Sequence, residues 1–150
     1  MSPQEMWQAY CTAAGKQGTP PMPVPEYFDD NERGANILAD LVLRGIKRAT
    51  CSAVWTYNHL NEQIPQAGEL WLVTNWAGEA QCILETTRVD IIPFNEVSEE
   101  FAFMEGEGDR TLAHWRKVHE IFFRRQFEKE PHKFDETMPL VCQRFEVVYP

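Results

Sequence analysis

The chain has 150 residues, 43% hydrophobic and 25% charged, a composition typical of one globular domain that buries roughly two-thirds of its unfolded surface. Its formal charge of -9 argues against a protein that holds nucleic acid mainly by phosphate neutralisation, although it leaves room for a local basic groove. We expect a single domain over residues 1–150, in which residues 1–24 form an N-terminal helix and a proline-rich extension.

The cysteines are widely scattered and form no Cys-x-x-Cys motif, so their spacing suggests neither a zinc site nor a disulfide framework: Cys11, Cys51, Cys82 and Cys142. We expect buried free thiols and assign no metal and no cofactor. The N-terminus lacks the features of a signal peptide, and no apolar run approaches about 18 residues. A soluble, cytoplasmic protein with no membrane partner is expected.

The first third of the chain predicts two helices. Residues Pro3 to Ala14 place Met6, Trp7, Tyr10 and Cys11 on one helical face. Glycines and prolines between residues 15 and 25 predict an extended connection, too short to separate two domains. A second helix is expected over residues 31–44, and Gly45 follows at the position of a left-handed cap.

The remainder alternates strands and helices. Strands are expected over residues 50–55, 69–75, 79–89 and 141–149, with residues 89–94 continuing or following the third, and a helix over residues 111–127. The second and third strands are joined through Trp76-Ala77-Gly78. This order predicts the α+β class, with a small mixed sheet curled into a barrel.

An acidic turn, Glu105-Gly106-Glu107-Gly108-Asp109, precedes the helix that begins near Thr111. Glycine allows close backbone approach, and Asp109 is placed to cap the helix. The turn is a candidate site for proton transfer, a cation or a polar ligand. The alternative is an acidic helix cap on a surface loop.

A second candidate lies in Lys47-Arg48-Ala49-Thr50-Cys51-Ser52. Strand alternation places Thr50 and Ser52 on one face, and Ala49, Cys51 and Ala53 on the other. A lysine can activate a hydroxyl, or stabilise an oxyanion or a phosphate. The alternative is a surface lysine before an ordinary strand.

In the helix after Asp109, His119 shares a face with Trp115 and Phe123, which suits a core histidine or a catalyst. The basic residues of that helix are solvated or meet a phosphate: Arg116, Lys117, Arg124 and Arg125. Aromatic side chains could stack on bases or fill the core; the candidates are Trp55, Tyr57 and Trp76.

Together these segments resemble the ASCH family, whose fold is similar to the PUA RNA-binding domain. The resemblance runs from about Pro25 to the end of the chain and rests on residues 45–52, 93–97, 101–109, 115–116, 119–123 and 141–148. The Gly-x-Lys-x-Ala-Thr and Glu-Gly-Glu-Gly-Asp segments are specific in combination.

The resemblance implies a PUA-like short open β-barrel flanked by helices, with a cleft for RNA or a nucleoside. Some small bacterial members are amidohydrolases that deacetylate N4-acetylcytidine, others look like ribonucleases, and many have no assigned activity. The amidohydrolase pattern falls on Lys47, Thr50 and Glu105. Thr50 would attack the acyl carbon or position a water, and Lys47 would accept its proton. Glu105, with a pKa raised by acidic neighbours, would shuttle a proton to the amine.

The expected partner is therefore a nucleoside or single-stranded RNA, held by a further set of residues: Arg48, Ser52, Trp76, Gly106, Glu107, Arg116, His119 and Arg144. The competing predictions are a single-stranded RNA-binding protein or ribonuclease and a non-catalytic regulatory module. Divalent-metal dependence of RNA cleavage would implicate Glu105, Glu107 and Asp109 as ligands.

Overall fold

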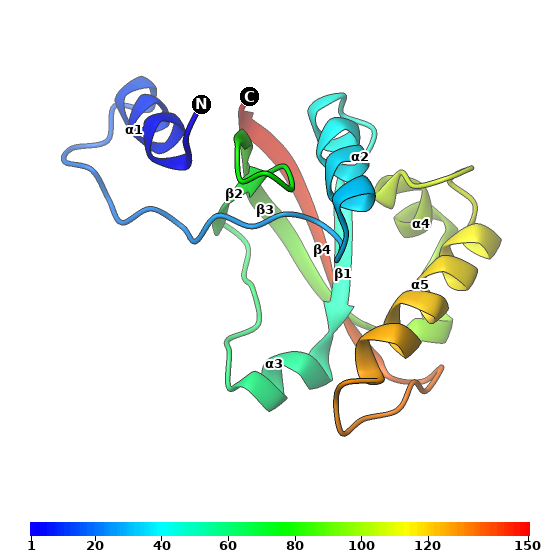
Figure 1. Ribbon diagram of the computed structural model, residues 1–150. Coiled ribbons are helices and arrows are strands. Elements are labelled where there is room, and N and C mark those ends of the chain that lie inside the picture. Colours follow the sequence, from blue (N-terminus) through cyan, green and yellow to red (C-terminus); the bar gives the residue numbers. More distant parts are fainter. The chain divides into compact units, whose positions relative to one another are not determined.

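The computed structural model describes residues 1–150 (Figure 1). They form two compact units. The first comprises Met1–Ile46, Gln66–Thr87 and Phe145–Pro150, and the second comprises Lys47–Pro65 and Arg88–Arg144. One four-stranded sheet has the order β1-β4-β3-β2, with strands β1 (Ala49–Ala53), β2 (Leu70–Thr74), β3 (Ala80–Pro93) and β4 (Pro139–Tyr149). Both β3 and β4 continue from one unit into the other. The single domain over residues 1–150 stays a prediction.

The first unit contains the two N-terminal helices, α1 (Pro3–Ala13) and α2 (Glu32–Leu43). Ser2 and Glu5 form a reciprocal capping box at the start of α1, and the Asn31 side chain accepts from the Gly34 N–H at the start of α2. Gly45 has the left-handed φ of +72° that ends a helix without a Cβ penalty. Both helices match their predicted ranges to within one residue at each end.

Apolar side chains of α1 pack on the sheet within this unit. Met6, Trp7 and Cys11 are buried in one cluster with Leu72 and Ile83. Strands β2 and β3 pair antiparallel, and Glu26 adds an isolated parallel bridge to Val73. The extension of residues 1–24 is thus part of this unit's core.

The second unit contains the antiparallel pair of β1 and β4, helices α3 (Val54–Leu60), α4 (Glu99–Glu105) and α5 (Leu112–Phe127), and the 3-10 helix η1 (Phe94–Glu96). Helix α4 packs against both α5 and β1. The core between them is largely aromatic, with Phe94, Phe101, Trp115 and Phe123 all buried. This packing brings β1, α4 and α5 together at the candidate site.

Several element boundaries differ from the prediction. The first strand ends at Ala53, and residues 54–60 turn into α3 instead of extending the strand to Trp55. Residues 89–93 continue the third strand, and the seven-residue helix α4 was not predicted. The predicted mixed sheet is built from antiparallel pairs, and its parallel element is the bridge at Glu26. The class is α+β, as predicted.

All four cysteines are free, and Cys51 is the one that is only partly buried. No helix of the structure has both the length and the apolar character needed to cross a membrane.

Candidate functional site

Strand β1 separates two chemically different faces. Ala49 and Ala53 are buried in the aromatic core of the second unit, with Cys51 packed against it. Thr50 and Ser52 therefore project from the opposite face, and both are half-buried. Thr50 is paired with Gln143 of β4, and cross-strand partners share a face. The predicted division of the strand is what the structure shows.

Tyr57 extends this polar surface from α3. The Ser52 hydroxyl lies 2.8 Å from the Tyr57 hydroxyl, a hydrogen-bond distance in which either oxygen can donate. We call the surface formed by the half-buried Thr50, Ser52 and Tyr57, together with the buried Gln143 beside Thr50, the polar face of β1. It offers hydroxyl and amide groups without an ionised side chain.

On the core side, Lys47 is 2% exposed and lies in a buried charge cluster. Its Nζ donates to Glu105 Oε1 at 3.2 Å, to Glu107 Oε2 at 3.1 Å and to the Glu105 carbonyl oxygen at 3.3 Å. Lys47 and the acidic turn, which the sequence predicts as two separate candidates, are thus in direct contact. The ion pairs of Lys47 with Glu105 and Glu107 hold the lysine against the turn.

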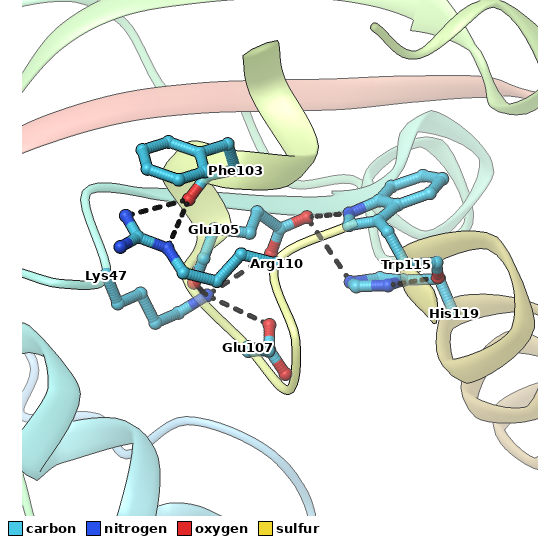
Figure 2. A network of polar contacts seen from close by, with 7 residues as sticks. All are labelled: Lys47, Phe103, Glu105, Glu107, Arg110, Trp115 and His119. Carbon is cyan, nitrogen blue, oxygen red and sulfur yellow. Dashed lines mark hydrogen bonds and ion pairs between the residues drawn. The ribbon is translucent and has the colours of Figure 1, made fainter. Parts of the chain in front are cut away.

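The second carboxylate oxygen of Glu105 faces away from Lys47, as Figure 2 shows. Glu105 Oε2 accepts from Trp115 Nε1 at 2.5 Å and lies 3.3 Å from His119 Nε2. The His119 ring stacks on Trp115 with centroids 4.3 Å apart, and its Nδ1 lies 2.8 Å from the Trp115 carbonyl oxygen. His119 is therefore both a core residue and a member of the cluster.

Opposite charges set the ionisation of this cluster. Burial alone would lower the pKa of Lys47, but the Glu107 and Glu105 carboxylates outweigh it and raise that pKa. Burial alone would raise the pKa of Glu105, but His119 and Lys47 outweigh it and lower that pKa. The expectation that acidic neighbours raise the pKa of Glu105 is wrong, because its nearest charged neighbours are cations. Lys47 is an ammonium here and cannot accept a proton from Thr50.

Two glycines shape the acidic turn. Gly106 has a φ of +74° at the end of α4, and Gly108 has a φ of +60°. A Cβ added to Gly108 would come within 2.1 Å of His114 Nε2, so the imidazole occupies the space that glycine leaves. Glycine is required at Gly108 for both conformation and close approach.

The start of α5 differs from the prediction that Asp109 caps it. The N-cap is Thr111, whose hydroxyl accepts from the His114 N–H at 3.1 Å. Asp109 instead accepts from the N–H and the hydroxyl of Thr111, which lowers the pKa of Asp109. Asp109 therefore orients the capping residue.

Arg110 fixes the turn from its other end. Its φ is +64°, and its guanidinium lies 3.6 Å from the centre of the Phe103 ring. Both Nε and Nη2 donate to the Phe103 carbonyl oxygen at 3.3 Å, in addition to the Gly106 N–H that the same oxygen accepts at 3.1 Å near the end of α4 (Figure 2).

The other predicted ligand residues lie outside the charge cluster. Arg48 is exposed, and its backbone N–H donates to the Met104 carbonyl oxygen. Arg116 donates to the Asn95 carbonyl oxygen at 3.4 Å. Arg144 pairs with Glu100 at 3.1 Å. The predicted set is thus distributed, and not gathered at one point.

Aromatic candidates have separate roles. Trp76 belongs to the first unit, is 40% exposed, and packs on Tyr27 at 4.9 Å. Trp55 is stacked between His59 and His132, with both centroid distances 4.5 Å. Trp55 is therefore engaged with protein rings on both sides.

The sequence did not identify Trp115 and Cys51 as members of the candidate site. The Cys51 sulfur, a Glu105 carboxylate oxygen and a His119 ring nitrogen lie within 4.8 Å of one another. Desolvation in the core, and then the Glu105 charge, raise the pKa of the Cys51 thiol well above its usual value. The signal was present in the strand alternation, because Lys47, Ala49 and Cys51 have the same parity and so turn toward one side.

The arrangement thus offers two kinds of chemistry. The charge cluster holds one ammonium, two carboxylates, an imidazole and a thiol in or near the core. The polar face carries neutral donors and acceptors, with the exposed Arg48 just before it in the chain.

A family model described as the ASCH domain matches residues 25–149. The crystal structure of an ASCH domain from Lactobacillus crispatus JV V101 is similar, with 40% identity, a TM-score of 0.89, and coverage of 98% of this chain and 94% of the other. Protein EF3133 from Enterococcus faecalis V583 is 35% identical with a TM-score of 0.90, and the match covers 98% of this chain and 88% of that protein. These matches confirm the predicted family resemblance and PUA-like fold.

The hypothetical protein PH0355 is only 16% identical, with a TM-score of 0.51, and shares the fold alone. A comparison with curated proteins finds no match.

Proposed function

Because the chain belongs to the ASCH domain family, generally RNA-binding modules of PUA-like fold, we propose that it binds single-stranded RNA or a nucleoside on the polar face of β1. Single-stranded nucleic acid exposes base edges that hydroxyl and amide groups read by hydrogen bonding. The net charge of -9 favours such base contacts over broad phosphate neutralisation.

One observation carries this proposal: the half-buried hydroxyls of Thr50 and Ser52 share a strand face with the Gln143 amide. Such groups both donate and accept, so they can match the mixed donor and acceptor edge of a base. Arg48, exposed and two residues before Thr50, supplies a cation for one phosphate or a base plane.

Binding is tested with a fluorescent single-stranded RNA and with free nucleosides, over a series of salt concentrations. Arg48→Ala should weaken RNA binding uniformly and reduce the slope of log affinity against log salt by about 1. Thr50→Val keeps the side chain's shape, and should cost about 1 kcal/mol of affinity through the lost hydroxyl. Lys117→Ala, at an exposed lysine of α5, is the matched control and should leave affinity unchanged.

Wild-type protein that binds neither RNA nor any nucleoside would contradict the proposal. Binding that Thr50→Val and Arg48→Ala leave untouched would move the ligand elsewhere on the molecule.

The charge cluster favours a second function, hydrolysis of an amide on a modified nucleoside of the N4-acylcytidine type. Strongly perturbed ionisable groups, gathered from separate elements, are characteristic of catalytic sites. Lys47 is an ammonium and Glu105 is a carboxylate, which are the protonation states of a general acid and a general base. Water would add across the amide to release a carboxylic acid and the amine. Because Thr50 lies on the opposite face of β1 from this cluster, it would hold the nucleoside by a hydrogen bond and would not attack the amide.

Hydrolysis is measured on N4-acetylcytidine and related acylated nucleosides. Glu105→Gln should lower kcat/KM at least roughly a hundredfold, whereas Thr50→Ala should lower it about tenfold through the lost hydroxyl, and Thr50→Ser should recover part of that loss. Thr50→Ala is the informative variant, because Thr50 lies outside the buried ion pairs and its loss should leave the fold intact. Full activity of Glu105→Gln, or an inactive wild type across the panel, would remove hydrolysis by this cluster and leave binding.

A further inference from the structure

We infer that Cys51, Glu105 and His119 form a zinc-binding site on the core side of β1. The three ligands come from β1, the last residue of α4 and the middle of α5, and their donor atoms lie within 4.8 Å of one another. The packing of α4 against α5 and β1 fixes these elements together. The site uses the opposite strand face from the proposed RNA surface and does not depend on that function.

The tautomer of the His119 ring, with a hydrogen on Nδ1, supports a zinc ligand at Nε2. Its Nδ1 lies 2.8 Å from the Trp115 carbonyl oxygen, which can only accept, so Nδ1 carries a hydrogen. His119 Nε2 then points at Glu105 Oε2, 3.3 Å away. In the neutral ring both of these atoms are acceptors, so the contact needs either a second proton or a cation. A backbone carbonyl that fixes one ring nitrogen leaves the other nitrogen available as a ligand, as in metal-ligating histidines.

The donor set selects the metal. A thiolate, an imidazole and a carboxylate are the three ligand types of protein zinc sites, whereas magnesium and calcium take mainly oxygen. Three protein ligands leave a fourth tetrahedral position for water or a ligand. Ligand atoms around tetrahedral zinc stand roughly 3.3 to 3.8 Å apart, so contraction by about 1 Å is required. The Cys51 side chain is expected to supply this movement, because Lys47 and Trp115 hold both oxygens of Glu105.

The surrounding charges suit a divalent cation. A Zn²⁺ ion bound by the Cys51 thiolate, the neutral His119 ring and the Glu105 carboxylate has no net charge with its ligands. Glu107, paired with Lys47 at 3.1 Å, compensates the nearby ammonium. Trp115 Nε1 and Lys47 Nζ donate to the two oxygens of Glu105 and orient its carboxylate, as partners of a ligating group do.

Cobalt reports directly on the sulfur ligand. Metal-free protein, prepared with a chelator that is then removed, is titrated with Co²⁺ while the thiolate-to-cobalt charge-transfer absorption is recorded. We expect saturation at one equivalent and loss of the absorption when one equivalent of Zn²⁺ is added. Cys51→Ala should abolish the band, and His119→Gln should weaken cobalt binding at least tenfold.

Cys82→Ala is the matched control, because Cys82 is a buried thiol in the other unit's core and should leave the band unchanged. Circular dichroism of each metal-free variant tests folding, and His119→Gln serves where Cys51→Ala does not fold. Zinc should also raise the Tm of the wild type and of Cys82→Ala, but not that of Cys51→Ala. A wild type without the charge-transfer band, or a band that survives in Cys51→Ala, overturns the inference.

Discussion

Glu105 connects two parts of the charge cluster through its two oxygens. Oε1 is paired with Lys47, whereas Oε2 accepts from Trp115 and faces His119. Lys47 and Glu105 side chains are 1% and 2% exposed, so each ion has exchanged nearly all its hydration for these contacts. Removing one partner then leaves a buried charge without full compensation, which costs more than the pair contributes.

A double-mutant cycle in metal-free protein tests this coupling by urea denaturation. Lys47→Met and Glu105→Leu should each lower the free energy of unfolding by about 3 kcal/mol, because each leaves buried charge unpaired. The double variant should lose clearly less than the sum, since it removes both charges together. Additive losses would show that the pair is not coupled.

An exposed pair on α5 provides the control for that cycle. Arg124 and Glu120 are 3.2 Å apart, with side chains 59% and 46% exposed. Breaking this pair with Arg124→Met should change stability by no more than about 0.5 kcal/mol, as solvent already screens both charges.

The acidic turn between α4 and α5 works as a positioning element. Its backbone passes through left-handed conformations at Gly106, Gly108 and Arg110, which reverses the chain within a few residues. This reversal brings the carboxylates of Glu105 and Glu107 to the same Lys47 ammonium. Without it, the Glu107 side chain could point to solvent. The conformation of the turn therefore determines the composition of the cluster.

Gly108→Ala tests that dependence. It should lower the free energy of unfolding by about 2 to 3 kcal/mol, through the positive φ and through displacement of the His114 ring. Gly15→Ala is the control: its φ is +66°, but an added Cβ has nothing within 4 Å. It should cost only about 1 kcal/mol by the same denaturation measurement. Equal losses at both positions would mean that the clash of the added Cβ with the His114 ring does not contribute to the loss of stability.

Long helices with a repeated apolar pattern were predicted more accurately than short helices. Helices α1, α2 and α5 carry repeated apolar positions over three or more turns, and their ranges were predicted closely. Helix α4 has seven residues, too few for a clear period, and it begins with a cap in which Ser98 accepts from the Phe101 N–H. The first two residues of α3, Val54 and Trp55, were predicted as strand because both have high strand propensity, and the rest of this short helix was not predicted.

The site was predicted in part for a similar reason. Lys47, Glu105 and His119 were selected as residues, and the structure places them in one cluster. Their burial could not be predicted, because it depends on packing between segments 58 positions apart in the chain. The same long-range packing reversed the expected direction of the Glu105 pKa and brought Cys51 into reach.

The N-terminal segment is integral to the core of the first unit. Trp7 is 5% exposed, and its indole N–H donates to the Pro20 carbonyl oxygen at 2.8 Å. This hydrogen bond joins α1 to the proline-rich segment, while the Trp7 ring packs in the cluster with Leu72 and Ile83. Residues before the family-matched region therefore contribute to global stability.

Trp7→Ala should lower the free energy of unfolding by about 3 kcal/mol, because it empties a packed site and removes the donor to Pro20. Trp76→Ala, at a tryptophan 40% exposed in the same unit, should cost less than about 1.5 kcal/mol. Thermal and urea unfolding of the two variants measure the difference. A Trp7→Ala protein as stable as Trp76→Ala would show that the segment is dispensable.

The bridge at Glu26 has a consequence for association between copies of this chain. Strand β2 is at one edge of the sheet, where unpaired backbone groups invite another strand to add. The Glu26 N–H donates to the Leu72 carbonyl oxygen at 3.1 Å, and the Thr74 N–H donates to the Glu26 carbonyl oxygen at 2.9 Å. The chain thus occupies its own sheet edge, and the proline-rich approach to Glu26 provides few donors with which a further strand could extend the ladder. The proline-rich connection and Glu26 after it therefore protect this edge of the sheet against edge-to-edge aggregation.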